Sequence, residues 1–286
     1  MNKSINKENL LCAAQIERFI QHLIYEERSV LTIQKYQRDI QMFCKYCSDK
    51  ELGRLVILEY KQYLTEKYKP TSVNSMLAAT NSYFQFLGCA ELTVKPLKIQ
   101  RSVFSEPERE LSKDEYKRLL NSAKRDKNER LYLLMQTICS TGIRVSELKF
   151  ITVEAVRKGR AEVFSKGKRR TVFITAELKT MLMNYIEKRR LDSGSVFISR
   201  NGNPLNRHRI WADMKALCED ANVKAGKVFP HNLRHLFART FYSIEKDLGR
   251  LADVLGHSNI NTTRIYTIEC GMEHEKILSR LSLVYK

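Results

Sequence analysis

The sequence predicts a mainly α-helical protein with one small antiparallel β-sheet, divided into two domains. Three observations support this prediction. Apolar residues recur at helical spacing through most of the chain. Two β-prone runs flank a turn within residues 160–175. Residues 94–110, which hold two prolines and little periodicity, have the composition of a linker between a helical segment at 12–93 and a larger segment at 111–286.

The first domain is expected to consist of helices whose apolar stripes form its core. The first stripe comprises Ile16, Phe19, Ile20, Leu23 and Ile24, and the second comprises Val30, Ile33, Tyr36, Ile40 and Phe43. A third helix is predicted at 54–68. A fourth follows Pro70, with Thr71 or Ser72 as its cap, and Gly88 stops it.

The second domain is expected to combine helices with the hairpin. Ser112 and Glu115 form a capping box at its start. Lys166–Lys168 is the turn of the hairpin, which therefore has a basic tip. Residues 196–205 indicate a further strand followed by a turn. Helices are predicted at 112–125, 129–140, 145–151, 175–190, 206–221 and 231–244.

The charge of the chain predicts a polyanionic partner. The 286 residues carry 50 Lys and Arg against 32 Asp and Glu, a net charge of +18. Residues 1–110 contribute +3 and residues 111–286 contribute +15, so the excess lies in the second domain. The seven cysteines have irregular spacing, which favours reduced thiols in a cytoplasmic protein, and the Cys44–Cys47 pair is better explained by helix packing than by zinc. No apolar run is long enough for a membrane span, so we expect a soluble protein.

Four motifs in the second domain point to chemistry on phosphate. They are TGIRVSEL at 141–148, SKGKRR at 165–170, HNLRH at 231–235 and LGHSNINTTRIY at 255–266. Cleavage of a phosphodiester needs a nucleophile, cations for the charge on the phosphoryl oxygens and an acid for the leaving oxygen. The motifs supply these groups without an acidic cluster for metal ions or a nucleotide-binding loop. The candidate catalytic residues are Arg144, Lys166, His231, Arg234, His257 and Tyr266.

Each candidate taken alone also has a structural explanation. Arg144 fits a surface helix, Lys166 a solvated hairpin, His231 a helix start and His257 a C-terminal helix cap. The joint pattern favours the chemical interpretation. His231 and Arg234 are spaced i, i+3, so both can address one anion at the positive end of a helix.

The motifs together resemble the tyrosine recombinase (phage integrase-like) family, in particular its compact Xer-type members and mobile-element integrases. Their order and separations agree as well, with 23 residues from Arg234 to His257 and nine more to Tyr266. The resemblance covers nearly the whole chain. It implies that residues 12–93 are a SAM-like core-DNA-binding domain, 94–110 a linker and 111–286 the catalytic domain.

The resemblance also implies how the reaction proceeds. Tyr266 would attack the DNA and form a 3′-phosphotyrosyl bond, while Arg144 and Arg234 hold the scissile phosphate. Because the bond energy is kept in that intermediate, no metal ion, ATP or other cofactor is expected. Lys166 would protonate the 5′-oxygen that leaves, with Lys168 as its nearby competitor.

The resemblance assigns supporting roles to other residues. His231 would assist proton transfer at the tyrosine, and His257 would hydrogen-bond the phosphate. Glu147 would orient local structure and His235 would act as a buttress. Two features depart from the family pattern. The family often has an aspartate in the segment after SEL, whereas here Glu154 stands nearby. Arg239, where small residues are common, adds a candidate phosphate contact.

The sequence predicts the oligomeric state and the residues that contact DNA only in outline. Residues Ile277, Leu278, Leu281 and Val284 form an apolar helical face, which either docks onto a neighbouring protomer or packs on its own domain. We expect a homotetramer on two double-stranded DNA sites, with a second recombinase or accessory factor left open. Arg207, His208 and Arg209 are candidates for DNA contact, although a solvated basic face explains them almost equally well.

The predicted function is site-specific DNA recombination by cutting and rejoining. A type IB topoisomerase uses a similar residue set and differs in relaxing DNA without strand exchange. A DNA-binding regulator that keeps the scaffold would form no covalent adduct, and a metal-dependent nuclease would lose activity in EDTA. The sequence does not specify the biological role, the target site or the base-reading residues.

Overall fold

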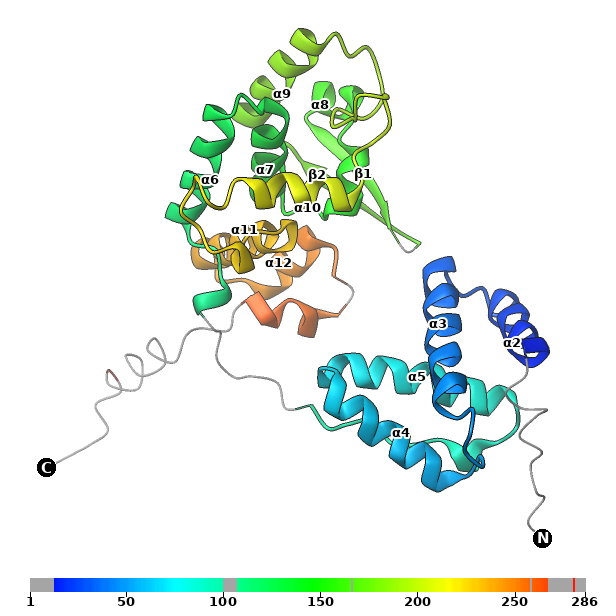
Figure 1. The fold of residues 1–286 in the computed structure, drawn as a ribbon. Helices are drawn as coiled ribbons and strands as arrows, with labels where there is room; N and C mark the ends of the chain where they lie inside the picture. The colour runs from blue at the N-terminus through cyan, green and yellow to red at the C-terminus, as the bar shows by residue number, and fades with distance from the viewer. Residues whose placement is uncertain (1–12, 100–106, 166, 258, 267–279, 281–286) are drawn as a thin grey trace, which may run out of the picture. The chain divides into compact units, whose positions relative to one another are not determined.

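The computed structural model describes residues 13–99, 107–165, 167–257, 259–266 and 280. The chain divides into two compact units, residues 1–101 and 102–286. Both are mainly helical, and one two-stranded antiparallel sheet lies in the second, so the predicted fold class is confirmed (Figure 1). None of the helices in the described ranges has the length and apolar character needed to cross a membrane.

The described residues of the first unit form four α-helices and one short 3₁₀ helix: α2 (Ala13–Tyr25), α3 (Val30–Tyr46), α4 (Arg54–Lys67), α5 (Pro70–Phe86) and η1 (Ala90–Leu92). Aromatic rings fill its core, where Phe43 packs edge-on against Tyr60 and Phe84. The predicted cap of α5 is wrong. The helix begins at Pro70, because proline lacks the N–H that would be unsatisfied in the first turn, and Lys69 precedes it without a side-chain cap.

The second unit is built around α7 and a β-hairpin. Its α-helices are α6 (Lys113–Arg125), α7 (Glu129–Thr141), α8 (Val153–Lys158), α9 (Ala176–Arg189), α10 (Arg207–Ala216), α11 (Pro230–Glu245) and α12 (Leu248–Leu255). Its short 3₁₀ helices are η2 (Pro107–Arg109), η3 (Val145–Phe150), η4 (Ala225–Lys227), η5 (Ile260–Thr262) and η6 (Arg264–Tyr266). The strands β1 (Arg160–Ser165) and β2 (Lys168–Phe173) form the predicted hairpin, with Val163 opposite Arg170. The predicted capping box of Ser112 and Glu115 is present at the start of α6.

Two expectations for this unit are wrong. Residues 145–150 form a 3₁₀ helix instead of an α-helix. Residues 196–205 form no ladder, only isolated bridges such as the one between Ile198 and Pro204, because a turn closed by Ser199 N–H and Asn203 O (2.7 Å) folds the segment onto itself. The helices α8 and α12 were not expected, since six and eight residues are too few to show a clear apolar stripe.

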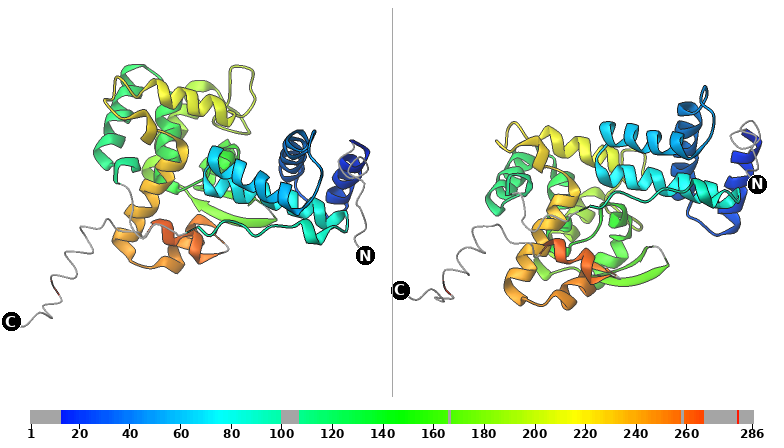
Figure 2. Two further views of the ribbon diagram at one scale, coloured as in Figure 1. Left: turned by 60° about the horizontal axis from the view of Figure 1, so that its bottom comes forward. Right: turned by 90° about the horizontal axis from the view of Figure 1, so that it is seen from below.

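The fold brings distant segments of the second unit together around α11. This helix packs on α7, α12 and η6. Figure 2 shows the orange segment from α12 to Tyr266 lying alongside α11. Beside the main core, a smaller cluster forms around Tyr266 with Ala238, Leu251 and Leu255. The motifs of the second unit therefore meet at the ends of α7, α11 and α12.

Candidate active site

Helix α11 presents three of the predicted residues, His231, Arg234 and His235. Pro230 starts the helix, and residues 231, 234 and 235 follow one another around its first turns. Arg234 is only 2% exposed. His231 opens to solvent, yet its ring lies 4.5 Å from that of His235 between centroids. Partial burial and the charges of Arg234 and Arg144 lower the pKa of His231, which favours its neutral form.

Arg234 is fixed by backbone carbonyls at the ends of two other helices. Its Nη1 donates to the carbonyl of Gly142, directly after α7, and its Nη2 donates to that of Leu255, at the end of α12 (2.8 Å). Burial and the neighbouring Arg144 lower the pKa of Arg234 to about 10, so it stays protonated at neutral pH. A guanidinium held in this way keeps a fixed orientation when it meets an anion.

Gly142 is required for this arrangement. It ends α7 with a φ of +63°, a conformation that glycine adopts without steric cost. A Cβ at this position would lie 2.5 Å from the ring of Phe237, so a side chain is also excluded by packing. The glycine of the TGIR motif thus lets α7 and α11 approach closely enough for Arg234 to reach the Gly142 carbonyl.

Arg144 is positioned by Glu147. Its Nη1 lies 3.0 Å from Oε1 of Glu147, and its backbone N–H donates to Oε2 at the same distance. Glu147 is 2% exposed. Burial acts to raise the pKa of Glu147, but the hydrogen bond from Arg144 and the charge of Arg170 outweigh it and hold the pKa below its ordinary value. Arg144 itself remains about one-third exposed and available to an anion.

Arg170 on β2 is a site residue that the sequence did not single out. Its Nη2 donates to Oε2 of Glu147 (2.6 Å), and its Nη1 donates to the carbonyl of Val254 in α12 (2.8 Å). A Cβ on Gly256 would overlap the Arg170 side chain. Arg170 therefore ties the hairpin, the Arg144 loop and the end of α12 together. Arg170 lies opposite Val163 in the hairpin, on the face that packs against the core. This alternation of faces along the strand is the one sequence signal that could have indicated that Arg170 is partly buried.

His257 both caps the end of α12 and lies in the catalytic cluster, so it combines the two roles that the sequence suggested for it. Gly256 ends α12 with a φ of +65°, and the backbone N–H of His257 caps it by donating to Ala252 O (2.9 Å). The ring lies between Arg234 Nη2, 2.9 Å from Nε2, and Thr263 Oγ1, 2.9 Å from Nδ1. Burial and Arg234 lower the pKa of His257 to about 4.

Tyr266 lies within this cluster, in the same chain. Its ring centroid is 4.6 Å from that of His235 and 6.0 Å from that of His257. The charge interaction between the phenol and Arg234 acts to raise the pKa of that guanidinium, against the effect of burial. Tyr266 is 3% exposed, packed in the cluster of Ala238, Leu251 and Leu255. The phenol and the guanidinium groups thus share one site.

The structure brings five of the six predicted residues together: Arg144, His231, Arg234, His257 and Tyr266. Lys166 lies outside the described residues, as does the side chain of Lys168. Arg239 bonds to Glu110 and to the carbonyl of Leu111 (2.8 Å) at the start of the unit, which leaves it a structural role instead of the expected phosphate contact. Glu154 bonds to the backbone N–H of Gly194 (3.3 Å).

Comparison with known proteins agrees with the family resemblance of the sequence motifs. The family model described as "Phage integrase family" matches residues 109–269, and "Phage integrase, N-terminal SAM-like domain" matches residues 16–90. The chain is 28% identical to tyrosine recombinase XerA of Pyrococcus furiosus, covering 97% of both chains. It is 30% identical to tyrosine recombinase XerD of Halalkalibacterium halodurans, covering 82% of this chain and 86% of the relative.

Solved structures show the same fold. The XerH site-specific recombinase bound to palindromic difH substrate, in a post-cleavage complex, aligns with a TM-score of 0.72 at 20% identity, over 98% of this chain and 90% of that one. A lambda integrase tetramer bound to a Holliday junction aligns with a TM-score of 0.70 at 18% identity, over 88% of this chain and 76% of that one.

Proposed function

The chain belongs to the phage integrase family and is a site-specific tyrosine recombinase, and we propose that Tyr266 is the residue with which it cuts and rejoins DNA. The observation that carries this proposal is the place of the Tyr266 ring, packed on His235 and close enough to the buried Arg234 of the same chain to act on its pKa. A phenol beside fixed guanidinium groups can lose its proton as it attacks, since the cations stabilise the developing negative charge.

The reaction conserves bonds and charge. The phenolic oxygen of Tyr266 attacks the scissile phosphorus, a Tyr–O–P bond forms at the 3′ end and the bond to the 5′-oxygen breaks. The phenolic proton passes to a neighbouring base, for which we propose His231 in its neutral form. The leaving 5′-oxygen takes a proton from Lys166. In the second half a 5′-hydroxyl attacks the phosphotyrosine and releases Tyr266, so no energy source is consumed.

The guanidinium groups act on the phosphate during both halves. We assign Arg144 and Arg234 to the two non-bridging oxygens, because planar forks match phosphate oxygens and both are held by partners on the protein side. His257 donates no hydrogen bond to a phosphate in the tautomer that its contacts favour, since Nε2 accepts from Arg234. Its proposed phosphate bond therefore requires the ring to rearrange or take up a proton when DNA binds.

The enzyme acts on DNA and works in a multimeric assembly. We propose a homotetramer on two duplexes, in line with the tetrameric state of the lambda integrase complex. We also assign residues 12–93 to core-DNA binding, 94–110 to the linker and 111–286 to catalysis, and place the enzyme in the cytoplasm with its DNA. The expected docking helix around Ile277, Leu278, Leu281 and Val284 lies outside the described residues.

A plasmid that carries two directly repeated copies of the target site tests this function. The site must first be found in the DNA that flanks the gene. We expect the protein to excise the intervening segment in EDTA, and Tyr266→Phe to be inactive. Relaxation of supercoiled DNA without excision would instead support a type IB topoisomerase, and binding without either product would support a regulator.

A further inference from the structure

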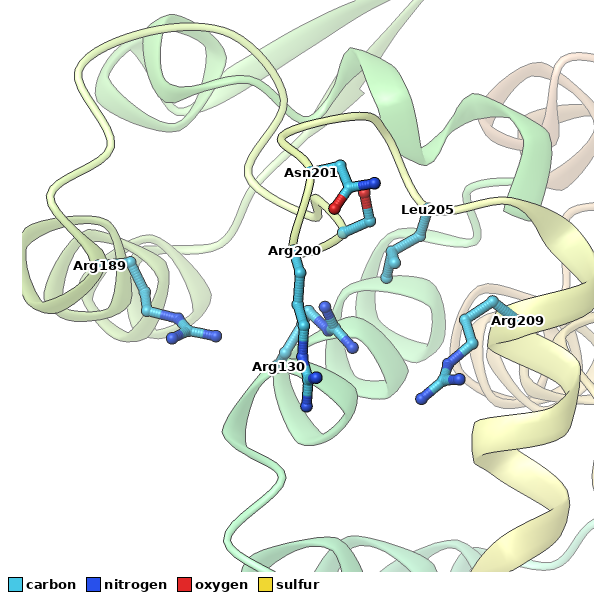
Figure 3. A pocket seen from close by; sticks show the side chains of 7 residues that line it. Arg130, Arg189, Arg200, Asn201, Leu205 and Arg209 are labelled. Carbon is cyan, nitrogen blue, oxygen red and sulfur yellow. The ribbon is translucent and has the colours of Figure 1, made fainter.

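An arginine-lined groove on the second unit lies outside the catalytic cluster. It encloses about 670 Å³ and is lined by Arg130, Arg189, Ser199, Arg200, Asn201, Leu205 and Arg209. These residues come from the start of α7, the end of α9, the loop before α10 and α10 itself. Figure 3 shows the guanidinium groups of Arg130, Arg200 and Arg209 converging on one space, which Arg189 faces from the opposite side.

The positive charge of this arginine groove is poorly neutralised by the protein. Arg130 is anchored by the carbonyl of Ile198 (2.8 Å) and shares the carboxylate of Asp213 with Arg209, at 3.8 and 2.9 Å. Arg189 donates to the hydroxyl of Tyr185 (3.4 Å). Arg200 is exposed and forms no ion pair among the residues that the structure describes. Among the described residues, Asp213 is the carboxylate that forms ion pairs with these four guanidinium groups, while Glu129 acts on Arg189 only through its charge, so the groove attracts anions.

The chemistry of the lining selects a phosphate. Guanidinium forks pair with phosphate oxygens in a bidentate manner, and the side chains of Ser199 and Asn201 add hydrogen-bonding groups. Leu205 is the only large apolar side chain in the lining, so the remaining apolar surface comes mainly from the aliphatic stems of the arginines. The groove is about half open to solvent, which suits an extended polyanion better than an enclosed small molecule.

Helix α10 connects the arginine groove with the catalytic cluster. Its first residue, Arg207, lies close enough to His231 for its charge to lower the pKa of that histidine. Two residues later, Arg209 lines the groove. The catalytic cluster and the arginine groove therefore both adjoin the first turn of α10. We propose that the arginine groove holds backbone phosphates of the DNA arm beside the cleavage point, as an anchor that does not read sequence; this rests on the proposed function.

Salt dependence of DNA binding tests the anchor. We would measure the Kd of Arg200→Ala and Arg200→Ala/Arg189→Ala for two unrelated duplexes by fluorescence anisotropy, all in the Tyr266→Phe background. The logarithm of the association constant, 1/Kd, decreases linearly with the logarithm of the salt concentration. The steepness of this decrease is expected to drop by about 0.9 for each phosphate that is no longer neutralised, equally for both duplexes. Arg200→Lys should keep the slope, because the charge remains. The matched control is Arg157→Ala/Lys158→Ala, two exposed basic residues at the end of α8.

The outcomes separate this proposal from the assignment of the nucleophile. A slope in the Arg200 variants equal to that of the α8 control overturns the anchor, even if a separate assay of the protein that retains Tyr266 yields a covalent adduct. A reduced slope together with no adduct in that separate assay supports the anchor and contradicts only the assignment of Tyr266 as the nucleophile. If inorganic phosphate raises the melting temperature through Arg200 while the DNA slope is unchanged, the groove binds a free anion and the anchor is overturned.

Discussion

The Nη2 nitrogen of Arg234 lies 2.9 Å from Nε2 of His257. Arginine can only donate, so Nε2 must be the acceptor and the ring proton must sit on Nδ1, where it is donated to Thr263 Oγ1 at 2.9 Å. The contact links the first turns of α11 to the segment that leads to Tyr266. It also requires His257 to be neutral, in agreement with its lowered pKa.

This contact predicts a loss of stability in mild acid. The unfolded histidine takes up a proton as the pH falls through its ordinary value of 6.5, whereas the folded one resists until about 4. The unfolded state then binds more protons, so the free energy of unfolding falls between these values and is unaffected above them. His235, with a pKa lowered to about 3 by burial and His231, acts in the same direction.

Urea unfolding at about pH 7.5 and about pH 5 measures the effect. His257→Gln should lose less stability between the two conditions than the unsubstituted protein, and the exposed His208→Gln should behave like the latter. An equal loss in all three proteins would remove His257 as a source of the pH dependence.

The sequence was most informative where a pattern is local. The stripes of α2 and α3 and the capping box of Ser112 involve neighbours within one or two turns, so spacing alone predicts them. The motif order predicted which side chains meet, because it resembles a known family. Arg170 could not be assigned in this way, since its partners Glu147 and Val254 lie 23 and 84 residues away. Only folding brings these three residues together.

Glu147→Gln is predicted to slow cleavage while leaving DNA affinity unchanged. The neutral amide weakens its bonds to both Arg144 and Arg170, so the phosphate clamp loses its fixed orientation. Misplacement of about 1 Å can reduce a rate by roughly 100-fold, and we expect a decrease of up to that size. Single-turnover cleavage at saturating DNA measures it. Glu154→Gln, which removes an exposed carboxylate of α8, is the control and should cleave normally.

Gly142→Ala is predicted to destabilise the protein and to impair cleavage. The substitution imposes both an unfavourable positive φ and a clash with Phe237, which displaces the carbonyl that holds Arg234. Strain of this kind costs about 1–3 kcal/mol. Thermal unfolding is compared with that of Gly159→Ala, which has a φ of +73° but open space around it. Equal destabilisation by the two substitutions would show that contact with Phe237 has no effect.

Arg144→Ala is predicted to bind DNA and to cleave it slowly. The side chain is about one-third exposed and bonds to no backbone carbonyl of the described residues, so the fold should survive, unlike that of a variant at the buried Arg234. Loss of one donor to a charged transition state costs about 10²–10³ in rate. The cleavage rate at saturating DNA checks this, and a rate within a few-fold of the unsubstituted enzyme would exclude Arg144 from the phosphate clamp.

In the proposed reaction, the phenol of Tyr266, held beside arginines of its own chain, becomes covalently joined to DNA. The direct measurement is peptide mass spectrometry of the protein trapped on a nicked duplex that carries its recombination site. After cleavage, the short fragment between the cleavage point and the nick dissociates with its 5′-hydroxyl, so the covalent bond cannot be resealed. We expect a 3′-linked nucleotide on the peptide that contains Tyr266, and no adduct with Tyr266→Phe. An adduct on a different residue, or one that persists in the Phe variant, would contradict it.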